Sequence, residues 1–272
     1  MAGMAMPGQG SGLWAAGEAY EPYVGRWSRI VAAEFLARLG VPAGADWLDI
    51  GCGTGALSGL ILRNHAPASV LGLDPSEGFL AHARRSLSNA RLSFRQGDAQ
   101  DLPVPDAAFD ALVSGLVLNF VPDQPKALAE MRRAARPGAM VAAYVWDYAE
   151  GMQMMRRFWD AAAALDAAGA GSQDEALRFA LCRPEPLRAL FEQAGLRGVK
   201  VWAIDIPTVF RDFEDYWSPF LRGGAPAPAY CLSLEEERRA ALRERLRATL
   251  PVAADGSIPL SARAWAVRGT AG

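Results

Sequence analysis

Residues 47–55 read Trp-Leu-Asp-Ile-Gly-Cys-Gly-Thr-Gly, and this stretch decides the fold of the chain. An apolar strand ends on an acid, Asp49, and the chain then turns through Gly51, Gly53 and Gly55 into the next helix. Glycine reaches positive φ at little cost and lets a ligand approach the backbone closely. The N–H groups at the start of a helix attract negative charge. The stretch therefore predicts a site for a nucleotide-like ligand that has an anionic end.

Two nucleotide ligands compete for this turn. Gly51, Gly53 and Ala56 fit the G-x-G-x-x-G/A fingerprint of nicotinamide dinucleotide sites. Asp49 argues against a dinucleotide, because a carboxylate at the carboxyl end of the strand would repel a pyrophosphate. S-adenosylmethionine carries an ammonium and a sulfonium and has no phosphate, so an acid at this position favours its binding. The residues of the turn therefore favour S-adenosylmethionine.

Two further acids follow predicted strand ends. A strand expected over residues 69–73 ends at Asp74, 19 residues after the glycine turn, a spacing typical of an acid that binds ribose hydroxyls. Alternatively, Asp74 caps the helix that follows it. A strand expected over residues 91–95 leads to Asp98, whose carboxylate is placed to accept from an adenine amino group while the Ala99 N–H donates to a ring nitrogen. Alternatively, Asp98 is a turn residue that bonds its own backbone.

Apolar strand patterns alternate with helical patterns along most of the chain. Strands are expected at residues 46–50, 69–73, 91–95, 108–114, 139–146, 200–206 and 258–267. After the fifth strand, helices are expected at residues 152–165, 174–181, 184–194, 213–221 and 234–250, with Gly/Ala-rich or Pro/Gly-rich breaks at 167–172 and 223–228. Asp123 is expected to cap a helix that runs through Arg133. This alternation predicts an α/β fold with a Rossmann-like doubly wound sheet.

The composition is that of a globular protein. The chain has 272 residues, of which 51% are hydrophobic and 21% charged, with a net charge of −2, so one α/β domain accounts for its length. No basic block is present, which argues against nucleic acid as a partner. The three cysteines have no metal or disulfide spacing, and no metal is expected. Because no signal peptide and no apolar run of membrane-spanning length is visible, a cytoplasmic protein without a membrane partner is expected.

In these motifs the chain resembles a class I S-adenosylmethionine-dependent methyltransferase of the ubiquinone/menaquinone-biosynthesis type (methyltransferase type 11). The resemblance covers about residues 45–147 and is carried by Leu-Asp-Ile-Gly-Cys-Gly-Thr-Gly at 48–55, Gly-Leu-Asp-Pro-Ser at 72–76, Gly-Asp-Ala at 97–99, Phe-Asp-Ala-Leu-Val at 109–113, and residues 131–141 with Arg-Pro-Gly at 136–138. It implies seven strands, mostly parallel with an antiparallel last strand inserted between the fifth and sixth, plus a helical cap. In the loop after strand four this chain has Asn119 where many relatives have a histidine.

The resemblance also implies a set of cofactor-binding residues. Asp49 and the glycines would bind the methionine moiety, Asp74 the ribose, and Asp98 with Ala99 the adenine. The full set expected for S-adenosylmethionine, or for its product S-adenosylhomocysteine, is Asp49, Gly51, Cys52, Gly53, Asp74, Pro75, Asp98, Ala99, Ser114, Tyr20 and Arg26. Tyr20 would close over the sulfonium by cation–π attraction, and Arg26 would bind a carboxylate. The other readings are packing for Tyr20 and a surface position for Arg26.

One domain is expected over residues 13–272, after a disordered N-terminus at 1–12. Within it we expect a helical lid at 13–44, a cofactor-binding core at 45–148, and cap inserts at 149–183 and 211–250. The assembly state is open between monomer and homodimer.

The acceptor is expected to be a small molecule bound above the carboxyl ends of the strands. Because methyl transfer is an in-line displacement with a good leaving group, positioning and desolvation should dominate catalysis. Asp147, Tyr148 and Tyr23 are the candidate catalytic residues, whereas His65 and His82 lie in the cofactor half and are expected to pack or face solvent. Trp146, Phe158 and Trp159 indicate an apolar or aromatic acceptor, unless they form core. The alternatives are a non-catalytic binder of the same cofactor and an NAD(P)-dependent oxidoreductase.

Overall fold

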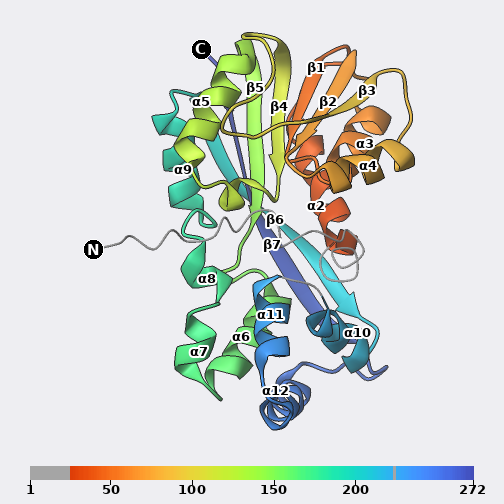
Figure 1. Ribbon diagram of the computed structural model, residues 1–272, viewed down its shortest axis with the longest axis vertical. Coiled ribbons are helices and arrows are strands. Elements are labelled where there is room, and N and C mark those ends of the chain that lie inside the picture. Colours follow the sequence, from red (N-terminus) through yellow and green to blue (C-terminus); the bar gives the residue numbers. More distant parts are fainter. Residues whose placement is uncertain (1–24, 223–224) are drawn as a thin grey trace.

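The computed structural model describes residues 25–222 and 225–272 of the chain. A seven-stranded sheet runs through the molecule in the order β3-β2-β1-β4-β5-β7-β6, with β7 antiparallel to both of its neighbours and the other pairs parallel (Figure 1). The strands are β1 (Asp46–Ile50), β2 (Ser69–Asp74), β3 (Leu92–Gln96), β4 (Phe109–Gly115), β5 (Ala135–Trp146), β6 (Arg197–Phe210) and β7 (Ile258–Thr270). The doubly wound sheet and the antiparallel last strand between the fifth and sixth are therefore confirmed.

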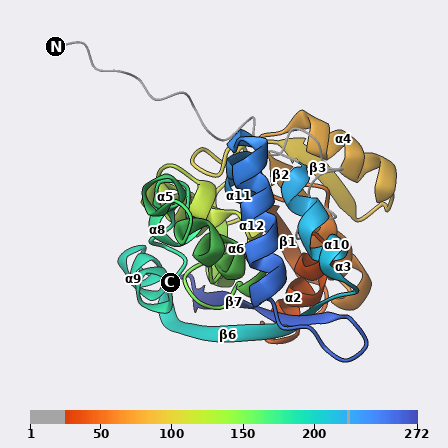
Figure 2. The ribbon, with the colours of Figure 1, turned by 90° about the horizontal axis from the view of Figure 1, so that it is seen from below.

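Helices cover both faces of the sheet. The first group is α2 (Arg26–Ala37), α3 (Ala56–Asn64) and α4 (Glu77–Ser86), and the second is α5 (Gln124–Ala134) with α9 (Pro184–Gln193) on the opposite face (Figure 2). A short 3-10 helix, η2 (Leu118–Phe120), follows β4. The predicted cap is present at the start of α5, where the Asp123 carboxylate accepts from the Lys126 N–H. The carboxyl ends of the parallel neighbours β1, β2 and β4 lie at one edge of the sheet, where ligands bind in such sheets.

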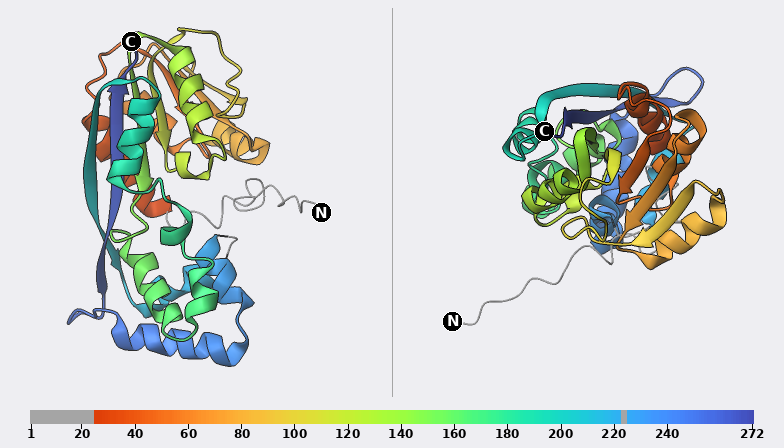
Figure 3. Two further views of the ribbon diagram at one scale, coloured as in Figure 1. Left: turned by 90° about the vertical axis from the view of Figure 1, so that its left-hand side faces the viewer. Right: turned by 90° about the horizontal axis from the view of Figure 1, so that it is seen from above.

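The remaining helices gather around the far ends of β6 and β7 (Figures 1 and 3). They are α6 (Gln153–Ala163), α7 (Ala167–Gly171), α8 (Glu175–Arg178), α10 (Phe213–Trp217), η3 (Ser218–Leu221), α11 (Pro226–Ser233) and α12 (Glu236–Thr249). The predicted helical cap is thus present. The expectation of a break at residues 167–172 was wrong, because Asp166 accepts from the Gly169 N–H and caps a short helix there. Residues 223–228 were expected to be a connection, yet helix α11 already begins at Pro226.

Strands β6 and β7 are longer than the sequence pattern predicts. The last β5 pair is Trp146 with Ala264, whereas β6 and β7 stay paired as far as Phe210 with Ile258, so the two strands leave the sheet as a ribbon that reaches the cap. Along this ribbon β6 alternates buried and exposed residues from Ile204 to Phe210, as a strand with one covered face should. The ribbon therefore connects the sheet to the cap.

The expected division into lid, core and cap inserts stays a prediction. The 1–12 segment and residues 13–24 of the 13–44 lid lie outside the described residues. Of the lid, α2 is described, and its buried Val31, Phe35 and Leu36 pack it against the sheet. No helix in the described ranges is long and apolar enough to cross a membrane.

Candidate functional site

The glycine turn lies between β1 and α3 and is fixed by backbone bonds to β2. The N–H groups of Gly51 and Cys52 both donate to the carbonyl of Leu73, at 2.7 and 2.9 Å. Gly51 has φ +73°, and a Cβ there would lie 2.5 Å from a methyl carbon of Val117. Gly53, with φ +52°, has no atom of the described residues within 4 Å of such a Cβ. The turn is therefore packed against protein at Gly51 and open at Gly53, on the side where a ligand is expected.

Asp49 is buried at the carboxyl end of β1, with 1% of its surface exposed. Its Oδ2 accepts a 2.6 Å hydrogen bond from the Ser58 hydroxyl on α3. The other oxygen, Oδ1, is buried and has no hydrogen-bond partner among the described residues. Burial raises the pKa of Asp49 to about 7, against which the Ser58 bonds act. An unpartnered buried carboxylate oxygen is costly, and a cationic donor placed beside it would be strongly favoured.

Asp74 lies at the end of β2 and binds the glycine turn directly. Its two oxygens accept from the Gly53 N–H at 2.9 Å and from the Ser76 N–H at 2.8 Å. Burial raises the pKa of Asp74 in spite of these bonds. The alternative that Asp74 caps helix α4 is wrong, because the N-cap is Ser76, whose hydroxyl accepts from Phe79. Pro75 stands between them and is exposed. Asp74 thus sets the position of the turn and keeps lone pairs for further donors.

Asp98 sits in an exposed turn after β3, beside the half-buried Ala99. Its Oδ1 accepts from the Gln100 N–H at 2.8 Å, which is the local turn geometry that the sequence left open. Gln100 also bonds onward, because its Oε1 accepts from the Asp123 N–H at 3.1 Å. The Gln100 side-chain amide also donates to both Asp98 oxygens, at 3.1 and 3.3 Å. The adenine role of Asp98 stays a prediction.

Cys52 is buried in the turn with 7% of its surface exposed. Its sulfur lies 2.9 Å from where a Cβ on Gly72 of β2 would stand, so the two residues pack together. Burial, followed by the charges of Asp49 and Asp74, raises the pKa of this thiol. The side chain is therefore an unreactive packing group.

The segment after β4 carries backbone strain. Ser114 is buried near the end of the strand, and Leu116 has φ +61°, a left-handed conformation that is rare for a branched side chain. The Leu116 N–H donates to the Tyr144 carbonyl at 2.8 Å, which holds that conformation. Asn119 in η2 is 6% exposed, and its Nδ2 has no partner within the described ranges. Strained backbone and an unpartnered donor gather at the strand end where an acceptor is expected.

The two described candidates for acceptor chemistry stand at the end of β5. The Asp147 carboxylate is 3% exposed and accepts from the Glu150 N–H at 3.1 Å, so it closes a turn. The Tyr148 ring lies 5.6 Å from the ring of Phe179, which in turn lies 5.1 Å from that of Phe120. These three rings, Phe120, Tyr148 and Phe179, form an aromatic trio that joins η2 to the segment after α8.

Arg26 is occupied by a partner that the sequence did not indicate. Its Nη1 donates to both oxygens of Asp215 in α10, at 3.1 and 3.2 Å. The guanidinium lies over the rings of Trp27 and Phe210, at 4.5 and 4.8 Å from their centroids. The start of α2 is thereby tied to the cap. Tyr20 and Tyr23, predicted to act beside Arg26, lie outside the described residues.

Trp146, Phe158 and Trp159 are core residues, each at most 2% exposed, so their role is packing. His65 contacts Trp47, with ring centroids 5.5 Å apart, and its pKa is lowered by burial. His82 is exposed. Both histidines therefore lie where the sequence analysis expected them.

Sequence reasoning missed two polar residues that matter here. Ser58 is a buried polar side chain of α3 that was not singled out from the sequence. Glu175 of α8 is 2% exposed and accepts from the Trp159 indole N–H, and burial raises its pKa to about 7. A single acid in a short helix gave no sequence signal for that burial.

Comparison with known proteins adds the family. Residues 48–143 match the model of a family described as a methyltransferase domain. The trans-aconitate 2-methyltransferase of Methylobacterium nodulans is 36% identical over 128 residues, 46% of this chain and 48% of the relative. The ubiquinone/menaquinone biosynthesis C-methyltransferase of Desulfotalea psychrophila is 34% identical over 113 residues, 42% of this chain and 44% of the relative. This chain thus spans about half the length of the curated relatives it matches.

Solved structures show the same fold. The phosphoethanolamine N-methyltransferase 2 of Haemonchus contortus, in complex with phosphomonomethylethanolamine and S-adenosylhomocysteine, aligns with a TM-score of 0.58 at 17% identity, over 93% of this chain and 56% of that one. The [4+2]-cyclase SpnF aligns with a TM-score of 0.54 at 20% identity, over 89% and 80%. The matched segment and the curated relatives identify residues 48–143 as a methyltransferase domain, and the solved structures show that this chain has the same Rossmann-like fold as those proteins.

Proposed function

We propose that this protein is an S-adenosylmethionine-dependent methyltransferase that acts on a small-molecule acceptor. The observation that carries the proposal is the buried Oδ1 of Asp49, which has no partner among the described residues beside an open glycine turn. A cationic ligand would pair with this oxygen, whereas the Asp49 carboxylate would repel a pyrophosphate. The observation therefore favours S-adenosylmethionine over a nicotinamide dinucleotide.

The described residues fit this cofactor in position and in chemistry. Asp49 would pair with the ammonium, and Gly53 leaves room for the methionine moiety to approach the turn. Asp74 would accept from the ribose hydroxyls with its remaining lone pairs, while its bonds to Gly53 and Ser76 hold the carboxylate in place. The Asp98–Ala99 turn, Pro75, Cys52 and Ser114 would line the rest of the site, as the resemblance implies.

Methyl transfer needs little chemical assistance from the protein's side chains. When bound, the cofactor supplies a methyl group on a positively charged sulfur, which is a good leaving group. The protein's part is to hold the acceptor in line and to exclude water, so proximity and desolvation carry the rate. Asp147 already accepts a hydrogen bond from the Glu150 N–H and so closes that turn. Tyr148 and Tyr23 stay candidate orienting residues.

The aromatic trio favours an acceptor with a planar or apolar body. Phe120, Tyr148 and Phe179 come from three different segments and meet beside the end of β4. Aromatic faces pack well against flat rings, and the Asn119 amide nearby offers a free donor among the described residues. A ring bearing a carbonyl or hydroxyl fits this setting, and the quinone named for one relative is of that kind. The tricarboxylate implied by the name of another relative would need cations in place of these rings.

A turnover assay tests the proposal. Purified protein with S-adenosylmethionine is incubated with sets of quinols, phenols, amines and carboxylic acids, and release of S-adenosylhomocysteine is measured by mass spectrometry. Acceptor-dependent release that is lost in Asp49→Asn supports the proposal, and we expect the quinol and phenol sets to respond. Tight cofactor binding with no release in any set would instead favour a non-catalytic binder or another reaction on this fold, such as that of the cyclase relative.

A further inference from the structure

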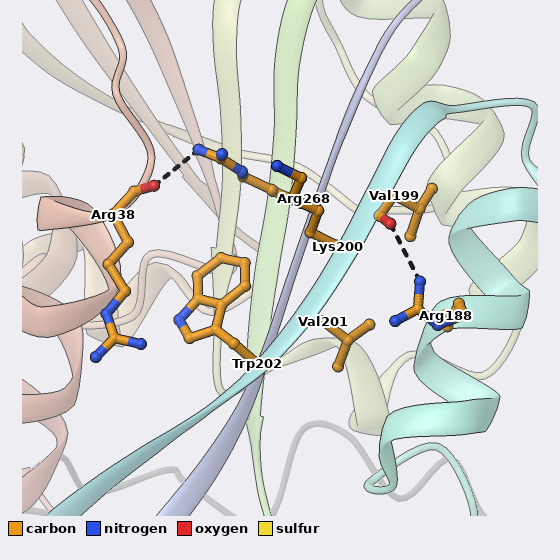
Figure 4. Close-up of a pocket in the computed structure, with 7 residues that line it drawn as sticks. All are labelled: Arg38, Arg188, Val199, Lys200, Val201, Trp202 and Arg268. Carbon is orange, nitrogen blue, oxygen red and sulfur yellow. Dashed lines mark hydrogen bonds between the residues drawn. The ribbon is translucent and has the colours of Figure 1, made fainter.

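A basic cavity of about 490 Å³ lies against β6, at the edge of the sheet (Figure 4). Its lining residues are Arg38, Arg188, Val199, Lys200, Val201, Trp202 and Arg268, which include four cations and no acid. None of the predicted cofactor residues lines it. β6 stands four strands from β1 in the sheet, about 19 Å at the usual strand spacing, so this cavity is separate from the glycine turn.

Two of the cations are held side by side. Lys200 of β6 pairs directly with Arg268 of β7 in the antiparallel register. Like charges placed opposite each other destabilise a sheet. Arg268 cannot easily turn away, because its Nη1 donates to the carbonyls of Arg38 and Leu39 at the end of α2, both at 2.8 Å. Lys200 is exposed and has no acceptor among the described residues. An anion bound between the two would relieve their repulsion.

Two further lining residues, Arg188 and Trp202, differ in whether their polar groups have partners. Arg188 is already partnered, because its Nη1 donates to the carbonyl of Val199, another lining residue, at 3.1 Å and lies 4.0 Å from a carboxylate oxygen of Glu192. Trp202 is half-buried, and its ring stacks on Phe35 with centroids 6.3 Å apart and planes 12° apart. Figure 4 shows the indole between Arg38 and the Lys200–Arg268 pair. Its buried N–H has no partner in the described part of the chain, which leaves a donor unsatisfied.

We propose that this cavity binds a small molecule that carries a phosphate group. The phosphate would lie between Lys200 and Arg268, and the organic part of the ligand would lie along the indole of Trp202. A dianionic phosphate suits clustered cations and accepts several hydrogen bonds. The cavity has the volume of ordinary small-molecule sites. The phosphate comes from either a nucleotide or an alkyl phosphate, because a base and an alkyl chain both pack on an indole.

The chain offers an internal control, because Lys126 and Lys200 are its only lysines. Reductive methylation with ¹³C-formaldehyde keeps both charges and gives one resolved NMR signal for each lysine. Titration with inorganic phosphate, uridine monophosphate and octyl phosphate should shift the Lys200 signal saturably and leave that of Lys126 in place. The organic phosphate from the matching source should bind about tenfold more tightly than inorganic phosphate, which corresponds to about 1.4 kcal/mol. Whichever organic probe gains affinity identifies the source.

Calorimetric measurement of organic phosphate binding by two lysine variants is a second test of the site. Lys200→Glu should weaken binding of the better organic phosphate at least about tenfold, while Lys126→Glu should leave it unchanged. Equal thermal midpoints of the two variants without ligand would show that Lys200→Glu still folds. Equal shifts at both lysines, no shift with any probe, or unchanged affinity in Lys200→Glu would overturn the site. Equal affinity for inorganic and organic phosphates would overturn the contact with Trp202.

Discussion

The Ser58 hydroxyl donates a 2.6 Å hydrogen bond to Oδ2 of Asp49, and it leaves Oδ1 of that carboxylate buried without a partner among the described residues. The bond crosses from α3 to β1, so the first helix after the glycine turn orients the acid that ends the first strand. It also counteracts the burial that raises the pKa of Asp49 to about 7. A single serine therefore sets both the direction and the charge of the group on which the proposed function rests.

Binding of S-adenosylmethionine should strengthen as the pH rises through 7. Asp49 must be ionised to pair with the ammonium, and its pKa of about 7 leaves it largely protonated at pH 6. We expect affinity to rise between pH 5.5 and 7.5 by up to about tenfold per pH unit, the limit for one proton released. Calorimetry across this range measures it. Ser58→Ala should move the midpoint to higher pH, whereas Asp98→Asn should leave it in place.

Asp49→Asn should separate stability from binding. A carboxyl group whose pKa is raised in the folded state favours folding below its unfolded pKa near 4, and this contribution is lost as the pH rises through 7. The amide never ionises, so the variant should unfold at higher temperature than the parent at pH 8 and at nearly the same temperature at pH 4. The gain at pH 8 should be about 2–4 kcal/mol. Cofactor binding should fall at least about a hundredfold, as expected for loss of a buried ion pair. A less stable variant at pH 8 would contradict this account of Asp49.

Two alanine substitutions in the glycine turn should differ in kind. Gly51→Ala places a Cβ 2.5 Å from Val117 at a φ of +73°, so it should destabilise the fold by about 2–4 kcal/mol. Gly53→Ala meets no atom of the described residues within 4 Å and should cost only about 1 kcal/mol in backbone strain. It should nevertheless weaken cofactor binding at least about tenfold, because its methyl group enters the space proposed for the ligand. Thermal unfolding and calorimetry together distinguish these outcomes, and unaltered binding in Gly53→Ala would place the ligand elsewhere.

Asp74→Asn should damage the turn as well as the site. The carboxylate accepts from two backbone N–H groups, of Gly53 and Ser76, and an amide presents only one oxygen to them. The amide nitrogen would then face a donor, at a cost of about 1–3 kcal/mol. We expect a lower unfolding temperature and at least tenfold weaker binding of S-adenosylhomocysteine. Asp98→Asn is the matched control, since that side chain is exposed and its change should leave the unfolding temperature nearly unaltered.

The Arg26–Asp215 ion pair should couple α2 to the cap. Burial alone would raise the pKa of Asp215, but the Arg211 N–H and the Arg26 guanidinium outweigh it and hold the pKa below its ordinary value. A double-mutant cycle with Arg26→Met and Asp215→Asn should give a coupling of about 1 kcal/mol at pH 7. Because the pKa is lowered, the coupling should be present above pH 4 and lost as the pH falls below the pKa of the folded state. A coupling of zero at pH 7 would contradict a connection through this pair.

Much of the sheet was predictable because its strands are marked by local pattern. Strand β1 lies at the expected residues, and β4 begins within one residue of the expected start, since apolar runs that end on Asp or Gly have few alternative readings. The ribbon of β6 and β7 was underestimated. Its outer residues pack on cap helices whose position no local pattern reports, so residues such as Val209 read as connection rather than strand.

The candidate site was predictable in its backbone and less so in its side-chain partners. Gly51, Asp49 and Asp74 follow from chain order, because each stands at or just after the end of a strand. The tie between Arg26 and Asp215 spans 189 residues and depends on where the cap folds back, which no spacing encodes. The contact of Phe179 with Tyr148 and Phe120 could not be predicted for the same reason, because it also depends on where the cap folds back. Helices α7 and α11 were missed because Gly, Ala and Pro are weak helix signals, and capping by Asp166 with packing in the cap stabilises α7.

Calorimetric titration of the intact protein with S-adenosylmethionine, S-adenosylhomocysteine and NADH, at pH 7.5, tests the central claim most directly. The Asp49 carboxylate and the open turn at Gly53 predict micromolar binding of the first two ligands and no detectable heat with NADH. Binding of NADH without the other two would contradict the assignment of Asp49 as the partner of a cationic ligand, and the proposed methyltransferase function with it.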